Sequence, residues 1–217
     1  MRTKRVSKAF VASLSTAFTL TLLFAHTANA QTGTSVDRGD WPVYHGGEFS
    51  QRYSPLDQIN AENVGSLEIA WRFATPNFGP STDFNNPSTP LEIDGVLYVN
   101  AGSTRNVAAL DATTGQVLWL WRPQEGSRYD EAPRKGAGRG VASYSNNGKT
   151  RVIDVTPGYQ LVSLDAKTGL LDPTFGEKGV VDLFVGLRNA DDPRFAHPDI
   201  GLSAPPFVMN DVIVVGA

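Results

Sequence analysis

The chain has 217 residues, of which 41% are hydrophobic and 19% charged, so it has enough apolar side chains to bury a core. Its formal net charge of −3 is too small to indicate a nucleic acid or an anionic membrane surface as a partner. The absence of cysteine excludes a disulfide framework and any chemistry that needs a thiolate.

Residues 1–30 have the pattern of a secretory signal peptide. Basic residues precede an apolar segment over 9–25, and the sequence Ala28-Asn29-Ala30 follows as a cleavage signal of the A-x-A type. A permanent membrane anchor is the alternative, but several Ser and Thr interrupt the apolar segment and make it a poor span. We therefore expect cleavage near Ala30 and a mature chain, 31–217, in the periplasm.

After residue 31 the sequence predicts short strands separated by turns, and no long helix. The alternating stretch 67–73 (LEIAWRF) predicts a strand, and apolar runs on both sides of Asp94-Gly95 predict a hairpin within 90–100. A helical turn is indicated at 60–64 (NAENV). The remaining expected strand pairs are 107–110 with 116–121, 151–155 with 160–164, and 207–209 with 212–215.

An internal repeat links the middle of the chain to its last third. The stretch AALDATTGQVLW (108–119) returns as VSLDAKTGLL (162–171). Each unit reads as a hairpin, a strand, a D-A-x-T-G corner and a further strand. Four antiparallel strands per unit form one blade of a β-propeller, so the expected fold is an all-β propeller.

The repeated corner has a structural explanation. Its Asp is expected to accept backbone N–H bonds, and Gly115 and Gly169 are expected to supply the positive φ that the turn needs. Trp119 is then expected to pack its indole between neighbouring blades. We therefore assign the motif to folding rather than to catalysis, despite its Asp.

An ordered series of segments resembles the PQQ-dependent (quinoprotein) dehydrogenases, whose propellers carry the repeat A-x-D-x-x-T-G-x-x-x-W. The resemblance covers about 40–217 and includes an arginine–glycine segment, 138–141 (GRGV), similar to the one that contacts the cofactor in that family. LLDPTFGEKGVVDL, which ends at Leu183, and 203–206 (SAPP) look like the glucose-dehydrogenase branch. The other matching segments are 41–44 (WPVY), 52–59 (RYSPLDQI), and Asn63-Val64 with 67–71 (LEIAW).

The resemblance implies a fold and an activity. It implies an eight-bladed propeller of four-stranded antiparallel blades, of which 31–217 would supply about three. The chain would then be a truncated N-terminal part of a periplasmic enzyme that oxidises a sugar or alcohol by hydride transfer to PQQ. The electrons would pass to a quinone or cytochrome acceptor. The Ca²⁺ ligands and the catalytic base are expected beyond residue 217, so the catalytic residues are unknown and no metal ligand is named.

Four residues are the candidates for contacting PQQ. Arg139 lies between glycines, which let a ligand approach the backbone, and its planar guanidinium suits carboxylates. The alternative for Arg139 is a solvated surface arginine. Ser203 and Thr156 offer hydroxyls where the family hydrogen-bonds PQQ, with ordinary turn capping as the alternative. Asn86 is the fourth candidate.

The sequence departs from the family pattern in two places. A Glu or Gln often contacts the quinone just before the strand that starts here at Leu91, but Pro87 takes that place. Asn86 or Ser88 is therefore left as the substitute. The adjacent-cysteine disulfide of the alcohol dehydrogenases is also missing, which favours the glucose-dehydrogenase branch.

Two loop histidines and an acidic loop carry no assigned chemistry. His45 and His197 are expected to be polar surface residues. Asp191, Asp192 and Asp199 lack the spacing of an EF-hand, so we expect a solvated loop rather than a calcium site.

A non-enzymatic PQQ-like propeller that acts as a protein-assembly scaffold is the alternative function. Outer-membrane assembly lipoproteins of this kind need a cysteine after the signal sequence, and this chain has none. They also lack the opening segment 41–59 and the Gly-Arg-Gly sequence. These differences favour the enzyme.

Overall fold

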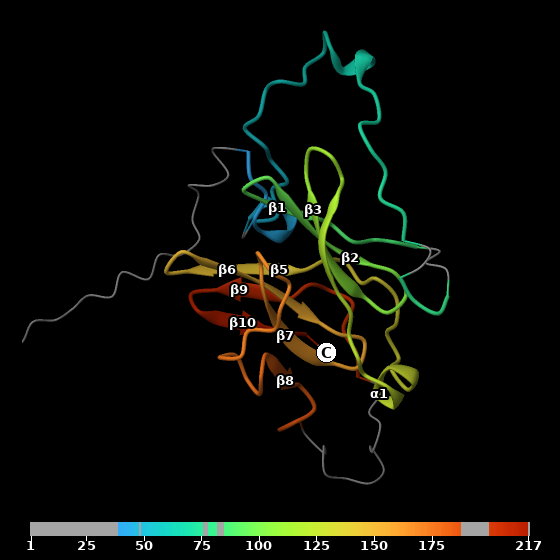
Figure 1. Ribbon diagram of the computed structural model, residues 1–217. Helices are drawn as coiled ribbons and strands as arrows, with labels where there is room; N and C mark the ends of the chain where they lie inside the picture. Colours follow the sequence, from blue (N-terminus) through green and yellow to red (C-terminus); the bar gives the residue numbers. More distant parts are fainter. Residues whose placement is uncertain (1–38, 48, 76–77, 82–84, 188–199, 217) are drawn as a thin grey trace, which may run out of the picture.

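The computed structural model describes residues 39–47, 49–75, 78–81, 85–187 and 200–216. Within them the regular structure is almost entirely antiparallel sheet (Figure 1). Two four-stranded sheets follow one another, and a two-stranded hairpin comes third. The predicted all-β architecture of four-stranded units is confirmed. The predicted signal peptide lies outside the described residues.

The first sheet is the first complete blade. Its strands run in chain order across the sheet and are β1 (Leu91–Ile93), β2 (Val96–Ala101), β3 (Asn106–Asp111) and β4 (Val117–Trp121). The predicted hairpin at Asp94-Gly95 is confirmed. Both turn residues have positive φ, 50° and 81°, as a tight hairpin turn between twisted strands requires.

The second sheet repeats this order. Its strands are β5 (Ala142–Asn146), β6 (Lys149–Val155), β7 (Gln160–Asp165) and β8 (Val180–Asp182). The third unit begins with the hairpin of β9 (Phe207–Met209) and β10 (Val212–Val214), and β9 lies against β5. The described residues therefore contain two complete blades and the first hairpin of a further one.

A hydrophobic cluster joins the two complete blades. Leu91 and Val107 of the first sheet pack with Val152 and Leu164 of the second, and all four side chains are fully buried. Burial of this apolar surface is the main force that holds neighbouring blades together.

The two D-A-x-T-G corners have the same hydrogen bonds. Asp111 Oδ1 accepts the N–H groups of Thr113 and Thr114 at 3.0 and 2.7 Å and the Thr114 hydroxyl at 2.8 Å. Asp165 accepts the equivalent three bonds at the second corner. The Thr114 hydroxyl and backbone N–H bonds lower the pKa of Asp111. The predicted structural role of the motif is confirmed.

Each corner also receives a tryptophan from the neighbouring unit. Trp119 donates from Nε1 to Ala166 O at 2.9 Å, and its ring lies so close to Gly169 that a Cβ there would meet it at 2.5 Å. The predicted packing of Trp119 between blades is confirmed. Trp71 makes the same contacts with the first corner, through Ala112 O at 3.1 Å and Gly115 at 2.5 Å. Trp71 thus occupies the position of an outermost-strand tryptophan in a preceding blade.

The prediction of a strand at 67–73 is wrong for the described structure. The segment forms no strand, because a strand needs a hydrogen-bonded neighbour and the described residues provide none beside it. Leu67 and Ile69 are 58% and 65% exposed. The helical turn predicted at 60–64 is confirmed, because the Val64 N–H donates to Asn60 O at 3.0 Å, and the 3-10 helix η3 (Val64–Ser66) follows it directly.

Two short helices are not anticipated from the sequence. They are the 3-10 helix η2 (Tyr44–Gly46) and α1 (Ser127–Asp130), which lies in the connection from β4 to β5 (Figure 1). Among the described residues, no helix has the length and hydropathy needed to cross a bilayer.

Candidate cofactor site

The antiparallel topology gives each blade two different ends. The β1–β2 and β3–β4 turns lie at one end, which carries the hairpin and the D-A-x-T-G corner. The β2–β3 turn and the β4-to-β5 connection lie at the other end, which we call the connection end. All four predicted cofactor contacts are in segments of the connection end, namely Asn86 before β1, Arg139 before β5, Thr156 after β6 and Ser203 before β9.

Backbone hydrogen bonds bring three of these segments together. The Thr89 N–H donates to Arg139 O at 2.9 Å, and the Arg139 N–H donates to Ser203 O at 2.8 Å. Thr89 also forms a parallel bridge with Gly140. The segments that precede β1, β5 and β9 therefore lie side by side. Arg139 is in the middle, Ser203 is on one side, and Asn86 is three residues from the other.

Arg139 presents its charged side chain to solvent. It is exposed, and its guanidinium has no polar partner among the described residues. Gly138 and Gly140 have φ of 73° and 136°, which favours glycine, and a Cβ on Gly140 would lie 2.8 Å from Thr89 O. The backbone thus holds a cation that no described residue pairs with, and such a cation suits an anionic ligand.

The side chains of Ser203 and Asn86 have hydrogen-bond donors that no described residue uses. Ser203 is half-buried, and its hydroxyl makes no hydrogen bond to a described residue. Asn86 is exposed, and its Oδ1 accepts the Ser88 N–H at 3.1 Å. The Ser88 hydroxyl in turn accepts the Asn100 N–H at 3.2 Å and donates to no described residue, so Ser88 stays open as the substitute for Asn86. The assignment of Ser203 and Asn86 as PQQ contacts remains a prediction.

Thr156 is buried and makes two side-chain hydrogen bonds. Its hydroxyl donates to Glu125 Oε1 at 2.6 Å and accepts the Gln160 N–H at 3.0 Å. Glu125 also accepts the Gly158 N–H, at 3.0 Å to Oε2. This arrangement caps the β6–β7 turn, which is the alternative that the sequence left open. The hydroxyl is the only donor of the Thr156 side chain and it points to Glu125, so the place of Thr156 in a cofactor site remains a prediction.

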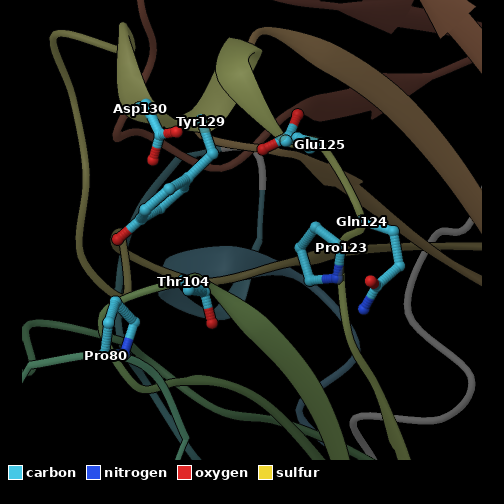
Figure 2. Close-up of a pocket in the computed structure, with 8 residues that line it drawn as sticks. Pro80, Thr104, Pro123, Gln124, Glu125, Tyr129 and Asp130 are labelled. Atoms are coloured by element: carbon cyan, nitrogen blue, oxygen red, sulfur yellow. The ribbon is translucent and has the colours of Figure 1, made fainter.

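Glu125 also lines an open pocket of about 280 Å³ at the connection end. Figure 2 shows Glu125 and Tyr129 on the α1 side of this pocket, with Pro80 and Thr104 on the opposite side. Sequence reasoning missed Glu125, because a single carboxylate after a strand carries no motif. Within the described parts of the chain, no group of three or more His, Cys, Asp and Glu residues could hold a metal ion. The calcium site therefore remains a prediction.

A buried polar cluster lies beneath the connection end. Asn100 donates from Nδ2 to Asp154 Oδ2 at 2.9 Å, and both residues are buried between the sheets. Burial raises the pKa of Asp154 to about 7, even though the nearby Arg105 charge and the Asn100 bond act in the opposite direction. Sequence reasoning missed the cluster. Its one visible signal in the sequence was Asp154, which stands between the apolar Ile153 and Val155.

The raised pKa of Asp154 predicts a pH-dependent stability. Between about pH 4 and pH 7 the folded state retains a proton that the unfolded state has released, so the free energy of unfolding falls as the pH rises. The fall is expected to reach up to about 4 kcal/mol, at about 1.4 kcal/mol per pKa unit. Urea unfolding of the wild type and Asp154→Asn across this range measures it. The amide should remove this part of the slope, and an unchanged slope in the variant would contradict the assignment.

A family model described as "PQQ: Glucose/ethanol/alcohol dehydrogenase, beta-propeller domain" matches residues 41–217. The chain is 31% identical to the glycerol dehydrogenase large subunit of Gluconobacter thailandicus over 85% of its length. It is 30% identical to the quinoprotein glucose dehydrogenase of Escherichia coli over 89% of its length. In both comparisons the matched part of this chain corresponds to only 25% of the length of the relative.

A solved structure gives the same result. The fold resembles a quinohemoprotein alcohol dehydrogenase from Pseudomonas putida with a TM-score of 0.60 and 30% sequence identity. The match covers 82% of this chain and 23% of that one. The predicted resemblance to quinoprotein dehydrogenases is confirmed, and the relatives include glucose, glycerol and alcohol dehydrogenases.

Proposed function

The chain belongs to the family of PQQ-dependent glucose, ethanol and alcohol dehydrogenases, and on this premise we propose that it forms part of a periplasmic enzyme that oxidises a sugar or an alcohol. The observation that carries the proposal is the set of backbone hydrogen bonds that joins Thr89, Arg139 and Ser203 into a row at the connection end. The middle residue of this row, Arg139, carries a guanidinium that has no partner among the described residues. Because the chain spans about a quarter of its relatives, 25%, the activity is proposed for the whole protein.

The donors of this row suit the chemistry of PQQ, a flat quinone that carries carboxylates. Arg139 would bind a carboxylate or a quinone oxygen through its planar fork of N–H groups. Ser203 would donate its unengaged hydroxyl to a neighbouring oxygen, and Asn86 has side-chain N–H donors available at the other side. Bound PQQ supplies the carbonyl that accepts a hydride from the substrate. Arg139 would also stabilise negative charge that develops on an adjacent oxygen.

The location and partners belong to the same proposal. The signal-like sequence at 1–30 supports export to the periplasm. The proposed electron acceptor is a quinone or a cytochrome. Ca²⁺ is proposed as a second cofactor, with ligands and a catalytic base outside the described residues. We also propose that the protein belongs to the glucose-dehydrogenase branch of the family, and that its substrate preference follows from this membership.

An activity assay on the protein expressed from its complete reading frame tests the proposal. The protein is loaded with PQQ and Ca²⁺, and reduction of an artificial electron-accepting dye is followed with a panel of sugars and alcohols. We expect reduction with at least one substrate, and loss of activity when PQQ is omitted. A folded protein that retains no PQQ and oxidises no substrate would contradict the proposal and favour an assembly scaffold.

A further inference from the structure

Arg105 lies in the β2–β3 turn at the connection end and is the largest fully buried side chain among the described residues. We propose that Arg105 is a positioning residue, which holds the three segments carrying Arg139, Thr156 and Ser203 in one arrangement. This inference rests on the proposed function, because it gives Arg105 the task of shaping the PQQ site.

The guanidinium of Arg105 donates to four backbone carbonyls. Nε donates to Gly136 O at 3.1 Å, and Nη2 donates to Arg134 O at 2.9 Å. Nη1 donates to Val155 O at 2.9 Å and to Leu202 O at 2.6 Å. A guanidinium has five N–H donors in a rigid plane, so one side chain can join segments that are far apart in the sequence.

The bound carbonyls adjoin the candidate contacts. Val155 directly precedes Thr156, and Leu202 directly precedes Ser203. Gly136 and Arg134 belong to the segment that reaches Arg139. Among the described residues, no other side chain donates to all three of these segments. A shift of Arg105 would therefore change the spacing between the candidate contacts together rather than one at a time.

The surroundings keep the charged guanidinium in place. Burial lowers the pKa of Arg105, while the charge of Asp154, once that group is ionised, and the charge of Glu125 favour the charged form of the guanidinium. The segment before Arg139 also closes over it, since a Cβ on Gly138 would lie 2.9 Å from Arg105 Nε. Arg105 is further held at a φ of 55°, a backbone conformation that a non-glycine residue adopts only when its surroundings impose it.

Two variants displace the guanidinium in different ways. Arg105→Lys keeps the charge but loses the planar fork, and Gly138→Ala keeps Arg105 but inserts a methyl group against it. Arg151→Lys is the matched control. Arg151 is a partly buried arginine of β6 that pairs with Asp172 and bonds to none of the three segments.

The test measures two quantities on the complete protein. The first is the dissociation constant for PQQ in the presence of Ca²⁺, by fluorescence titration. The second is amide hydrogen exchange of the cofactor-free protein in peptides that cover 134–141 and 200–204. We expect both variants to raise the dissociation constant at least tenfold and to accelerate exchange at the Arg139 amide, which is bonded to Ser203 O. The control should stay within about twofold in both measurements.

The outcomes separate this inference from the proposed function. Wild-type affinity and exchange in both variants would overturn the role of Arg105, and so would an equal loss in the control. If the wild type binds no PQQ, the proposed function fails, and exchange alone then decides whether Arg105 orders the three segments. If Arg105→Lys does not fold, Gly138→Ala supplies the same comparison.

Discussion

Replacing Arg139 by alanine is expected to weaken PQQ binding by about 10- to 150-fold. A hydrogen bond to a charged group contributes about 1.5–3 kcal/mol, and each 1.4 kcal/mol is a factor of ten in affinity. The stability of the folded state should be unchanged, because the Arg139 guanidinium is exposed and has no polar partner among the described residues. Fluorescence titration with PQQ, alongside thermal unfolding of the same sample, measures both effects.

Two further variants make this prediction specific. Arg139→Lys should fall between the wild type and the alanine variant, because lysine keeps the charge but cannot bind a carboxylate through two parallel N–H groups. Arg72→Ala removes an exposed arginine from a different part of the chain and should bind PQQ as the wild type does. Wild-type affinity in Arg139→Ala would show that Arg139 is an ordinary surface arginine.

Gly169→Ala is expected to lower the free energy of unfolding by about 2–5 kcal/mol. The φ of 69° at Gly169 costs an L-residue about 1–2 kcal/mol. The added Cβ would also lie 2.5 Å from the Trp119 ring, and overpacking of this kind costs about 1–3 kcal/mol more. Urea unfolding monitored by tryptophan fluorescence measures the loss.

Gly95→Ala is the matched control for this prediction. Gly95 has a similar φ of 81°, but nothing lies within 4 Å of the position that a Cβ would take. The control should therefore show the backbone cost alone. Equal losses at Gly95 and Gly169 would mean that the tryptophan contact contributes nothing to the junction between blades.

The sequence predicted the blades well because local signals define them. Turn residues such as Asp94-Gly95 fix the hairpins, and the D-A-x-T-G corners carry their own hydrogen bonds within a few residues. The segment 67–73 shows where local signals fail. Its alternation and aromatic residues favour a strand, and Trp71 docks on the next corner as Trp119 does. A strand forms only where a partner strand lies beside it.

The candidate site was only partly predictable for the same reason. The family resemblance predicted Arg139, Ser203, Thr156 and Asn86 as cofactor contacts. The structure joins the backbones of Arg139 and Ser203 by a hydrogen bond of 2.8 Å. The resemblance did not reveal Arg105, whose hydrogen bond to Leu202 O joins residues 97 positions apart in the sequence. Glu125 was equally hidden, because its partner Thr156 belongs to the next blade. Such buried polar contacts depend on how blades pack, and no short motif encodes them.

A structure of the complete protein with PQQ bound is the most direct test of the central claim, that the connection end of these blades forms part of the cofactor site. We expect PQQ at this end, with an oxygen within about 3 Å of the Arg139 guanidinium. PQQ bound at the corner end of the blades, or at the connection end without contact to Arg139, would contradict the claim.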